Sequence, residues 1–451
     1  MTGHLISRRS ALAGIALIAV AASSRIGRAA PPTDATKEFH LDTDANETDQ
    51  SARLQAAIDA AVKQGRLLLL PAGGFNVADL EFPVGLALSG ISGRTILTTP
   101  GDKRLAHIAG PGEGSLADIV FQANAPDTAA GVQGLIEIAD GATVTFRGCQ
   151  FNNCAGNGIA ASDSALTIED CDFYAAEAAA IHSQNGRGLM IRGNRISACG
   201  NAGIRVWRDD PGFDGTIING NRISKVDFRD GGNGQNGNGV SIYKADGVVV
   251  SDNVISDCAF SAVRVNEGRD TQIHGNTCTN SGEVAIFSEF AFSGSVIADN
   301  IVDGAATGIS ITNLDSGGHL ATCTGNIVRN VAPASANNPE TQPVGIYAEA
   351  DTVIANNAVE GVPGVGILAG NGPYVRNVAV TGNVVTKTRY GIGVSIVQDP
   401  KAGAVRVTSN IVGPGSEHGI VGLEWEKLVS TDLTADADRY PNVTVRDNTV
   451  G

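Results

Sequence analysis

The sequence predicts an all-β fold: a single-stranded, right-handed parallel β-helix with an N-terminal capping helix. One short motif recurs along most of the chain, a second recurs in step with it, and the composition favours tight turns. The 451 residues include 57 glycines, whereas aromatic residues make up 5% and charged residues 18%. This composition suits short strands joined by turns better than it suits helices. A solenoid grows along one axis, so a single domain can use the whole chain.

The first motif is a dipeptide that usually ends in asparagine and follows a short β-branched strand. Its copies are irregularly spaced, with a minimum of 22 residues between Cys149 and Cys171, which occupy the asparagine position. This spacing indicates a coil of constant size with inserted loops. Asparagines stacked at one turn can hydrogen-bond along the column, so we interpret them as structural. The asparagine copies are Gly193-Asn194, Gly220-Asn221, Asp252-Asn253, Gly275-Asn276, Asp299-Asn300, Gly325-Asn326, Ala355-Asn356, Gly382-Asn383, Ser409-Asn410 and Asp447-Asn448.

The second motif, Gly-Ile or a close variant, opens a second strand in each repeat. Two motifs in fixed order leave little room for another architecture. If the isoleucine points into the coil, the residues one and three places later point outward, because strand side chains alternate. Its copies include Gly158-Ile159, Ala180-Ile181, Gly203-Ile204, Gly239-Val240, Ala262-Val263, Ala285-Ile286, Gly308-Ile309, Gly345-Ile346, Gly366-Ile367, Gly391-Ile392 and Gly419-Ile420.

A helix over residues 49–65 is expected to cover the N-terminal end of the coil, because an open end exposes unpaired strand edges. Thr48 or Asp49 can cap this helix, and Gly65 ends it. Residues 31–48 are then a linker, and residues 49–451 form the β-helix with its cap. The apolar face of the helix is expected to contain Leu54, Ala57, Ile58 and Ala61.

Residues 1–30 carry the pattern of a twin-arginine signal peptide. Arg8 and Arg9 precede an apolar run from Ala11 to Ala22, and small residues lead to a cleavage site after Ala29 or Ala30. The run is shorter than the ~20 residues that span a bilayer, which disfavours a membrane anchor as the alternative. The expected partner is therefore the twin-arginine translocation machinery. The expected location is periplasmic or secreted, with no membrane span after cleavage.

Charge and cysteine content argue against a nucleic-acid-binding protein and against a protein held together by disulfides. The formal net charge is −15, and nucleic-acid binding rests on lysine and arginine, so no nucleic-acid partner is expected. An odd number of cysteines, seven, argues against a full disulfide framework. We expect buried thiols instead.

The stretch from Asp49 to Gly73 resembles the entry segment of pectin-lyase-like proteins. It contains Leu54-Gln55-Ala56-Ala57-Ile58-Asp59 and Leu70-Pro71-Ala72-Gly73. The chain after the signal resembles that superfamily throughout. The signal together with the repeat is similar to a family of exported β-helix repeat proteins with no assigned reaction.

Chemically active side chains gather on the outward strand positions between His182 and Glu289. Arginine holds carboxylates through paired hydrogen bonds and aromatic faces support sugar rings, so this surface predicts a groove for a sugar chain. We expect Arg205 and Arg264 to be surface residues about 10 Å apart whose removal costs little stability. The alternative is an ordinary solvated surface. The candidate substrate-binding residues are Arg205, Trp207, Arg208, Arg264, Glu267 and Glu289.

Residues 203–218 resemble the turn of β-helical alginate epimerases that carries Asp-Pro-His-Asp. Asp210, Pro211 and Asp214 occupy similar places, but glycine and phenylalanine stand where that family has histidine. Chemistry at a uronate needs an acid and a base within reach. His182 or Tyr243 would have to replace the missing carrier. The candidate catalytic residues are Asp210, Asp214, His182, Tyr243 and Lys244.

The cofactor is left open, with calcium as the one candidate ion. Asp209, Asp210 and Asp214 suit Ca²⁺ if their oxygens converge on one turn, although carboxylates in so acidic a chain are as readily solvated.

Two functional hypotheses follow. The first is an exported protein that binds, and as an enzyme modifies, an anionic uronate-containing polysaccharide by lyase-, epimerase- or glycoside hydrolase-like chemistry. The alternative is a non-catalytic glycan-binding or envelope structural protein that has lost the catalytic histidines.

Overall fold

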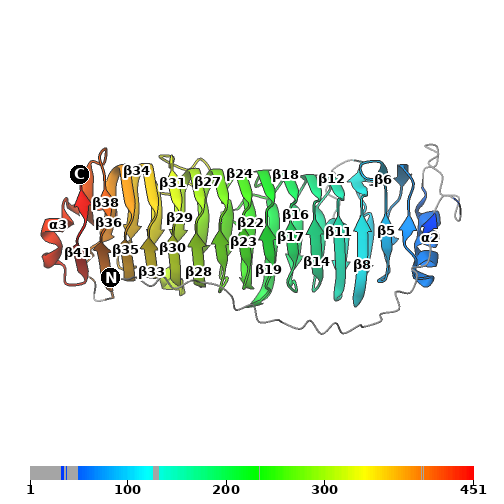
Figure 1. Ribbon diagram of the computed structural model, residues 1–451, viewed down its shortest axis with the longest axis horizontal. Helices are drawn as coiled ribbons and strands as arrows, with labels where there is room; N and C mark the ends of the chain where they lie inside the picture. Colours follow the sequence, from blue (N-terminus) through cyan, green and yellow to red (C-terminus); the bar gives the residue numbers. More distant parts are fainter. Residues whose placement is uncertain are drawn as a thin grey trace, which may run out of the picture. The chain divides into compact units, whose positions relative to one another are not determined.

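The structure, a computed structural model, describes residues 32–34, 37, 49–124, 132–232, 234–397, 399 and 401–451. The predicted signal peptide over residues 1–30 and most of the predicted linker lie outside the described residues. From Pro32 onward the described residues form a parallel β-helix of about 13 turns, which confirms the predicted fold class. Figure 1 shows its strands stacked in chain order from α2 at one end to α3 at the other.

Each turn of the coil contributes strands to three faces. One face is a 16-stranded parallel sheet. It consists of β1 (Thr33–Asp34), β2 (Leu68–Leu69), β5 (Ala87–Ser89), β8 (Gly112–Ala117), β11 (Ala142–Arg147), β14 (Ala165–Glu169), β17 (Met190–Arg192), β20 (Ile217–Asn219), β23 (Val249–Ser251), β26 (Gln272–His274), β28 (Ser293–Ala298), β30 (His319–Thr324), β33 (Ala350–Ala355), β35 (Arg376–Thr381), β37 (Val405–Thr408) and β41 (Val443–Arg446).

The other two faces belong to a 26-stranded sheet that bends between them. The face after the asparagine motif contains β3 (Gly73–Asn76), β6 (Thr95–Thr99), β9 (Val120–Ala123), β12 (Gln150–Cys154), β15 (Asp172–Ala176), β18 (Arg195–Cys199), β21 (Arg222–Val226), β24 (Val254–Cys258), β31 (Ile327–Arg329), β38 (Ile411–Val412) and β42 (Thr449–Val450).

The third face, called here the Gly-Ile face, begins each strand at the second motif. It contains β4 (Leu80–Glu81), β7 (Ala106–Ala109), β10 (Gly134–Ala139), β13 (Asn157–Ser162), β16 (Ala179–Gln184), β19 (Ala202–Phe213), β22 (Asn238–Asp246), β25 (Val263–Asn266), β32 (Val344–Ala348), β39 (His418–Glu424) and the antiparallel β40 (Lys427–Ser430). Four long strands run over both faces: β27 (Thr277–Glu289), β29 (Ile301–Ile311), β34 (Ala358–Ala369) and β36 (Val384–Ser395).

The asparagines form a buried ladder along the coil. Each side-chain amide from Asn194 to Asn410 donates to the side-chain oxygen of the next asparagine at 2.9 to 3.0 Å, and the ladder ends at Asn448. One assignment was wrong: the ladder uses Asn357 and not Asn356. The residue before each ladder asparagine has φ between 54° and 69°, and Asn356 fills that position. This left-handed backbone explains why glycine, aspartate or asparagine precedes nearly every ladder residue; Ser409, with φ of 58°, is the exception.

The interior of the coil is a continuous apolar core. The isoleucines of the second motif are buried, as predicted, and Ile181, Ile204 and Ile286 have no exposed surface. All seven cysteines are buried and free, which confirms the expected thiols.

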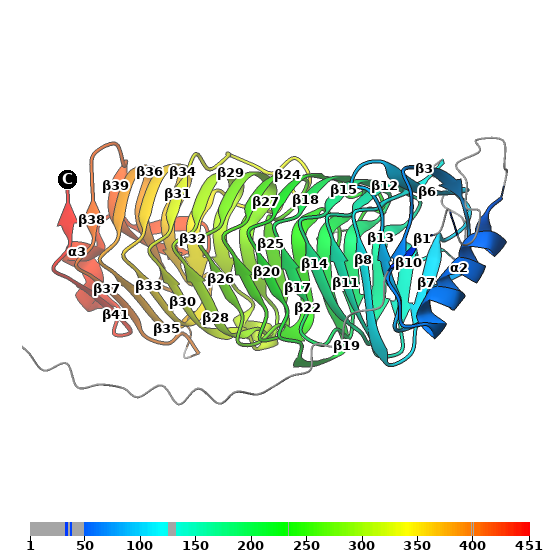
Figure 2. The same cartoon turned by 45° about the vertical axis from the view of Figure 1, so that its right-hand side comes forward.

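Helices cover both ends. The predicted cap is α2 (Ser51–Lys63), and its buried residues are the four expected ones, Leu54, Ala57, Ile58 and Ala61. The N-cap residue is Gln50 and not the predicted Asp49, although Asp49 accepts a hydrogen bond from the Ser51 amide at 2.9 Å; Thr48 lies outside the described residues. Figure 2 shows α2 across one end of the coil, and at the other lie α3 (Leu433–Asp436) and the short 3₁₀ helix η2 (Ala437–Arg439). A second 3₁₀ helix, η1 (Leu314–Ser316), lies in a loop. The strand β1 falls where the sequence predicted a linker.

Candidate functional site

The strand register confirms the outward columns of the Gly-Ile face. In the first column, His182 pairs with Arg205, Arg205 with Ser241, Ser241 with Arg264, and Arg264 with Phe287. In the second, Trp207 pairs with Tyr243, Tyr243 with Asn266, and Asn266 with Glu289. The sequence pattern therefore places these side chains on one outer surface.

Two loops cover this surface, so the expectation of exposed arginines is wrong. Arg205 is only 8% exposed and Arg264 only 9%. The loop formed by residues 227–232 and 234–237, called here the 227–237 loop, lies over both: Asn236 accepts from Arg205 Nη2 at 2.6 Å, and a Cβ added at Gly234 would lie 1.7 Å from Arg264 Nη1. The 330–343 loop approaches from the other side, where the Asn338 amide donates to Glu283 at 2.7 Å.

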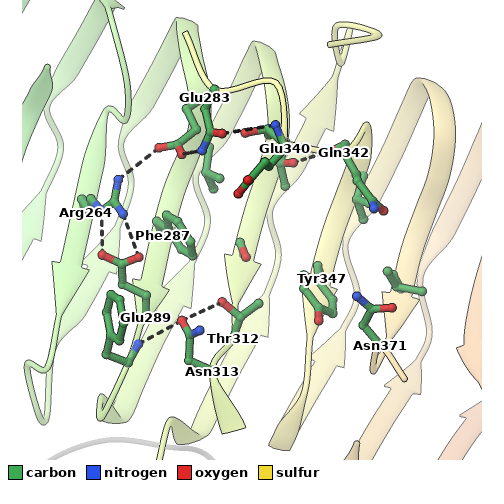
Figure 3. Close-up of a pocket in the computed structure, with 18 residues that line it drawn as sticks. Arg264, Glu283, Phe287, Glu289, Thr312, Asn313, Glu340, Gln342, Tyr347 and Asn371 are labelled. Atoms are coloured by element: carbon green, nitrogen blue, oxygen red, sulfur yellow. Dashed lines mark hydrogen bonds and ion pairs between the residues drawn. The ribbon is translucent and has the colours of Figure 1, made fainter. Parts of the chain in front are cut away.

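Arg264 is the centre of a buried ion network (Figure 3). Its Nε and Nη2 donate to the two carboxylate oxygens of Glu289 at 2.6 and 2.8 Å, and its Nη1 donates to Glu283 at 3.1 Å. Its guanidinium also lies over the ring of Phe287. Burial raises the pKa of Glu283, although the positive charge of Arg264 and the amide of Asn338 oppose this shift. The arginine is therefore neutralised within the protein.

Two cavities lie side by side along the Gly-Ile face and share Arg264, Glu289 and Phe290. The first, the Trp207 cavity, has a volume of about 310 Å³ and is also lined by Trp207, Tyr243 and Asn266. The second, the Tyr347 cavity, has a volume of about 370 Å³. Figure 3 shows its lining, with Tyr347 and Asn371 at the end farther from Arg264. Together the two cavities make one groove along the coil axis, called here the groove.

Aromatic rings alternate with amides and hydroxyls along the groove. The indole Nε1 of Trp207 donates to the Ser241 hydroxyl at 3.0 Å, and Arg205 lies over the indole face. Phe290, at the wall shared by the two cavities, is 41% exposed and has φ of 55°. Tyr347 donates its hydroxyl to Glu349, and burial raises the pKa values of both groups. The polar lining includes Asn266, Ser310, Thr312, Asn313 and Asn338.

The candidate catalytic residues are distributed over separate places. His182 lines a different cavity, of about 790 Å³, one turn before Trp207, and its ring packs edge-on against that indole. Burial and then the charge of Arg205 lower its pKa to about 4. Tyr243 lines the Trp207 cavity, and Lys244 lies over the Tyr243 ring and donates to the Asp209 carbonyl at 3.2 Å.

Asp210 and Asp214 do not converge either. Asp210 is exposed, whereas Asp214 is 2% exposed and lines a fourth cavity of about 610 Å³, called here the Asp214 cavity. Burial raises the pKa of Asp214; its Oδ1 accepts from the Thr216 amide, and its Oδ2 is buried without a hydrogen-bond partner. Arg208 lines the same cavity and its Nε is also unpartnered. Glu267 lies at a strand end, with φ of 57°.

No three histidine, cysteine, aspartate or glutamate residues in the described part of the chain are grouped so that they can hold a metal ion. The calcium site expected at Asp209, Asp210 and Asp214 is therefore not assembled. Asp209 instead accepts from Gln184 and Asn185, at 2.7 and 2.8 Å.

Several groove residues were missed by the sequence argument. Glu283 and Asn338 lie outside the outward columns that the second motif defines. Tyr347 lies on the same outer surface, where it pairs with Ser310, but it comes after the stretch from His182 to Glu289 to which the sequence argument was restricted. Phe290 is an aromatic residue directly after the last outward position, and this is a local signal. The alternation of strand side chains alone does not show where such a residue points.

A family model described as periplasmic copper-binding protein (NosD) matches residues 121–308, and this stretch is similar to that family. The described residues do not fit a copper site. Copper selects imidazole or thiolate ligands, but no suitable cluster is present among the residues described. Burial raises the pKa values of Cys199, Cys278 and Cys323 to about 12, so these thiols are protonated at neutral pH.

None of the curated proteins compared matches this chain. Similar solved structures include the Dettilon tailspike protein (gp208), with 14% identity, TM-score 0.47, and 86% of this chain and 68% of that chain covered. A mannuronic acid specific polysaccharide family 6 lyase from human gut microbiota has 14% identity, TM-score 0.44, and coverages of 87% and 90%. The periplasmic alginate epimerase AlgG has 13% identity, TM-score 0.39, and coverages of 87% and 84%. Such values assign no activity to this chain. Within its described residues, no helix is long and apolar enough to cross a membrane.

Proposed function

We propose that this protein binds a polysaccharide chain in the groove and does so after export to the periplasm or the outside of the cell. The observation that carries the proposal is the pair of adjoining cavities, which share Arg264, Glu289 and Phe290 and extend along the coil axis. An elongated site suits a chain better than a small molecule. Its rings offer apolar faces, and its amides and hydroxyls offer hydrogen bonds, which is the combination that sugar units require.

The charges of the groove favour an uncharged chain over the uronate chain that the sequence suggested. The charged residues that line it are Arg264, Glu283, Glu289 and Glu340. Arg264 is already paired with two of these glutamates, so none of the described residues that line the groove is a cation free to neutralise a ligand carboxylate. A polyanion would meet like charge in a partly desolvated site, which opposes binding.

The same contacts favour binding over cleavage. Hydrolysis of a glycosidic bond commonly needs one carboxyl group to donate a proton and a second to act as base or nucleophile. Here both oxygens of Glu289 are held by Arg264, and the two oxygens of Glu283 are held by Arg264 and Asn338. The two carboxylates are therefore engaged in the ion network and are not available as the acid and base of a hydrolysis.

The experiment compares calorimetric titrations of the purified protein with uncharged oligosaccharides and with uronate oligosaccharides of equal length. We expect saturable binding of an uncharged chain, weakened severalfold by Phe290→Asn. Asparagine tolerates the left-handed backbone of that position, so the variant should fold normally. Tyr174→Ala is the control, because Tyr174 is 56% exposed on the neighbouring face. Equal affinity of Phe290→Asn and wild type, or binding of uronates alone, would contradict the proposal.

A second candidate is the uronate chemistry that the sequence suggested, and one observation favours it. Asp214, whose Oδ2 is buried and unpartnered, lines the same cavity as Arg208, whose Nε is also unpartnered. A carboxyl group with a raised pKa beside an unpartnered guanidinium donor can exchange a proton with a bound uronate. Assays of alginate and pectate for unsaturated products or changed epimer ratio test this. Turnover by the wild type that Asp214→Asn abolishes would establish it.

A further inference from the structure

Trp425 occupies an unusual position at the tip of the β39–β40 hairpin. Glu424 pairs with Lys427, so Trp425 and Glu426 are the two loop residues. Trp425 has φ of 57°, a backbone conformation that favours glycine or asparagine and is rare for a bulky side chain. Its side chain is nevertheless 51% exposed. A large apolar ring is thus displayed to solvent at a position that local backbone preference opposes.

The ring of Trp425 is held in place from two sides. A Cβ at Gly372 would lie 2.5 Å from the indole, so the ring rests on the backbone there. The ring of Tyr374, 36% exposed, meets the indole edge-on with centroids 6.3 Å apart. The loop is also attached to the groove wall, because Glu426 accepts a hydrogen bond from Gln342, which lines the Tyr347 cavity. We call these two rings the Trp425 platform.

The platform is continuous with the groove. Asn371 lines the Tyr347 cavity and forms two backbone hydrogen bonds with Tyr374, at 3.1 and 3.2 Å. A three-residue step therefore connects the last cavity residue to the platform. An apolar cluster on the outside of the coil supports the hairpin. It contains Leu368, Tyr390 and Leu423, the last of which belongs to β39.

We propose that the Trp425 platform is a sugar-stacking subsite at the end of the groove, so that the ligand is a chain long enough to contact both tryptophans. This inference rests on the proposed function, because it extends the same groove. Six strand pairings separate β19, which carries Trp207, from β34, whose end leads to the platform. At ~4.8 Å for each step, this distance is about 29 Å. The chain therefore needs several sugar units to reach from one ring to the other.

Only two tryptophans are present in the chain, and this makes the test direct. Trp207→Phe leaves Trp425 as the sole indole emitter, and Trp425→Phe leaves Trp207. Each variant is titrated with one series of uncharged oligosaccharides of increasing length, and the indole fluorescence is recorded. We expect short members to change the Trp207 emission only, and members above a threshold length to change both.

The outcomes separate the two proposals. A response of Trp207 without any response of Trp425, at every length, would overturn the platform and leave the groove. A response of Trp425 without Trp207 would overturn the groove as the principal site and, with it, the proposed spanning chain. If neither tryptophan responds to any oligosaccharide, both the groove and the platform are overturned.

A stability measurement distinguishes ligand binding by Trp425 from a purely structural role. Trp425→Gly should weaken the longest oligosaccharide about five- to tenfold, as expected for the loss of one aromatic stacking contact. Its melting temperature should stay close to that of wild type, because glycine relieves the left-handed backbone while the ring packing is lost. A large drop in melting temperature with unchanged affinity would assign the ring to folding alone and overturn the subsite.

Discussion

Glu289 accepts two hydrogen bonds from Arg264, at 2.6 Å from Nε and 2.8 Å from Nη2, on the outer surface of the coil. Both residues are outside the apolar core, yet Glu289 is only 3% exposed because loops cover the pair. The ion pair therefore behaves as a buried one. Arg264 and Glu289 therefore each need the other to balance their buried charge.

The first prediction follows from that dependence. Arg264→Ala leaves Glu283 and Glu289 buried without their cation, which should cost about 3 to 5 kcal/mol of unfolding free energy. Urea denaturation at neutral pH measures this. The loss should shrink as the pH is lowered, because protonation removes the uncompensated charge.

The control replaces all three charged groups together. Arg264→Met combined with Glu283→Gln and Glu289→Gln removes the ions but keeps the volume, so it should be closer to wild type than Arg264→Ala. If Arg264→Ala has the same unfolding free energy as wild type, Arg264 is a solvated surface residue and not the centre of a buried ion network.

The sequence predicted what the repeat determines and missed what the loops add. Each outward position follows from its distance to a buried isoleucine, so the column from His182 to Phe287 could be placed correctly. The contact between Asn338 and Glu283 joins residues 55 positions apart, and the register of one strand does not determine how an inserted loop folds back. The burial of Arg205 under Asn236 has the same origin. Charge on an outward column was therefore interpreted as solvated charge.

The second prediction concerns the asparagine ladder. Asn276→Ala removes an amide that donates to Asn300 and Val250 and an oxygen that accepts from Asn253. Because these partners are buried, the loss should be about 2 to 4 kcal/mol. Asn448→Ala, at the C-terminal end of the ladder where the residue is only partly buried, should cost clearly less. Equal losses in thermal unfolding would mean that the ladder is not a buried continuous network.

The third prediction concerns pH. The pKa of His182 is lowered from 6.5 to about 4 by burial and by Arg205, so the unfolded chain binds more protons between these values. The contribution of His182 to stability is therefore fully present above about pH 6.5. It falls as the pH is lowered towards 4, by up to about 3 kcal/mol.

His182→Gln should remove this component, so the difference in unfolding free energy between wild type and variant should change between pH 7 and pH 4.5. Titration of the imidazole by NMR gives a direct check. A midpoint near the ordinary histidine value would contradict the burial of His182 beside Arg205.

The last prediction tests whether the 227–237 loop shapes the groove. At Gly234, with φ of 111°, an added Cβ would lie 1.7 Å from Arg264 Nη1, so Gly234→Ala must displace the loop or the guanidinium. Gly231→Ala is the matched control, because Gly231 also has a positive φ, 68°, but a Cβ there meets nothing within 4 Å. The control should therefore show backbone strain alone, about 1 to 2 kcal/mol. Gly234→Ala should lose at least about 1 kcal/mol more from overpacking and should also weaken oligosaccharide binding, since Gly234 lines the Trp207 cavity. If both variants lose the same stability and bind alike, the loop does not press on Arg264, and the groove would be open where the structure closes it.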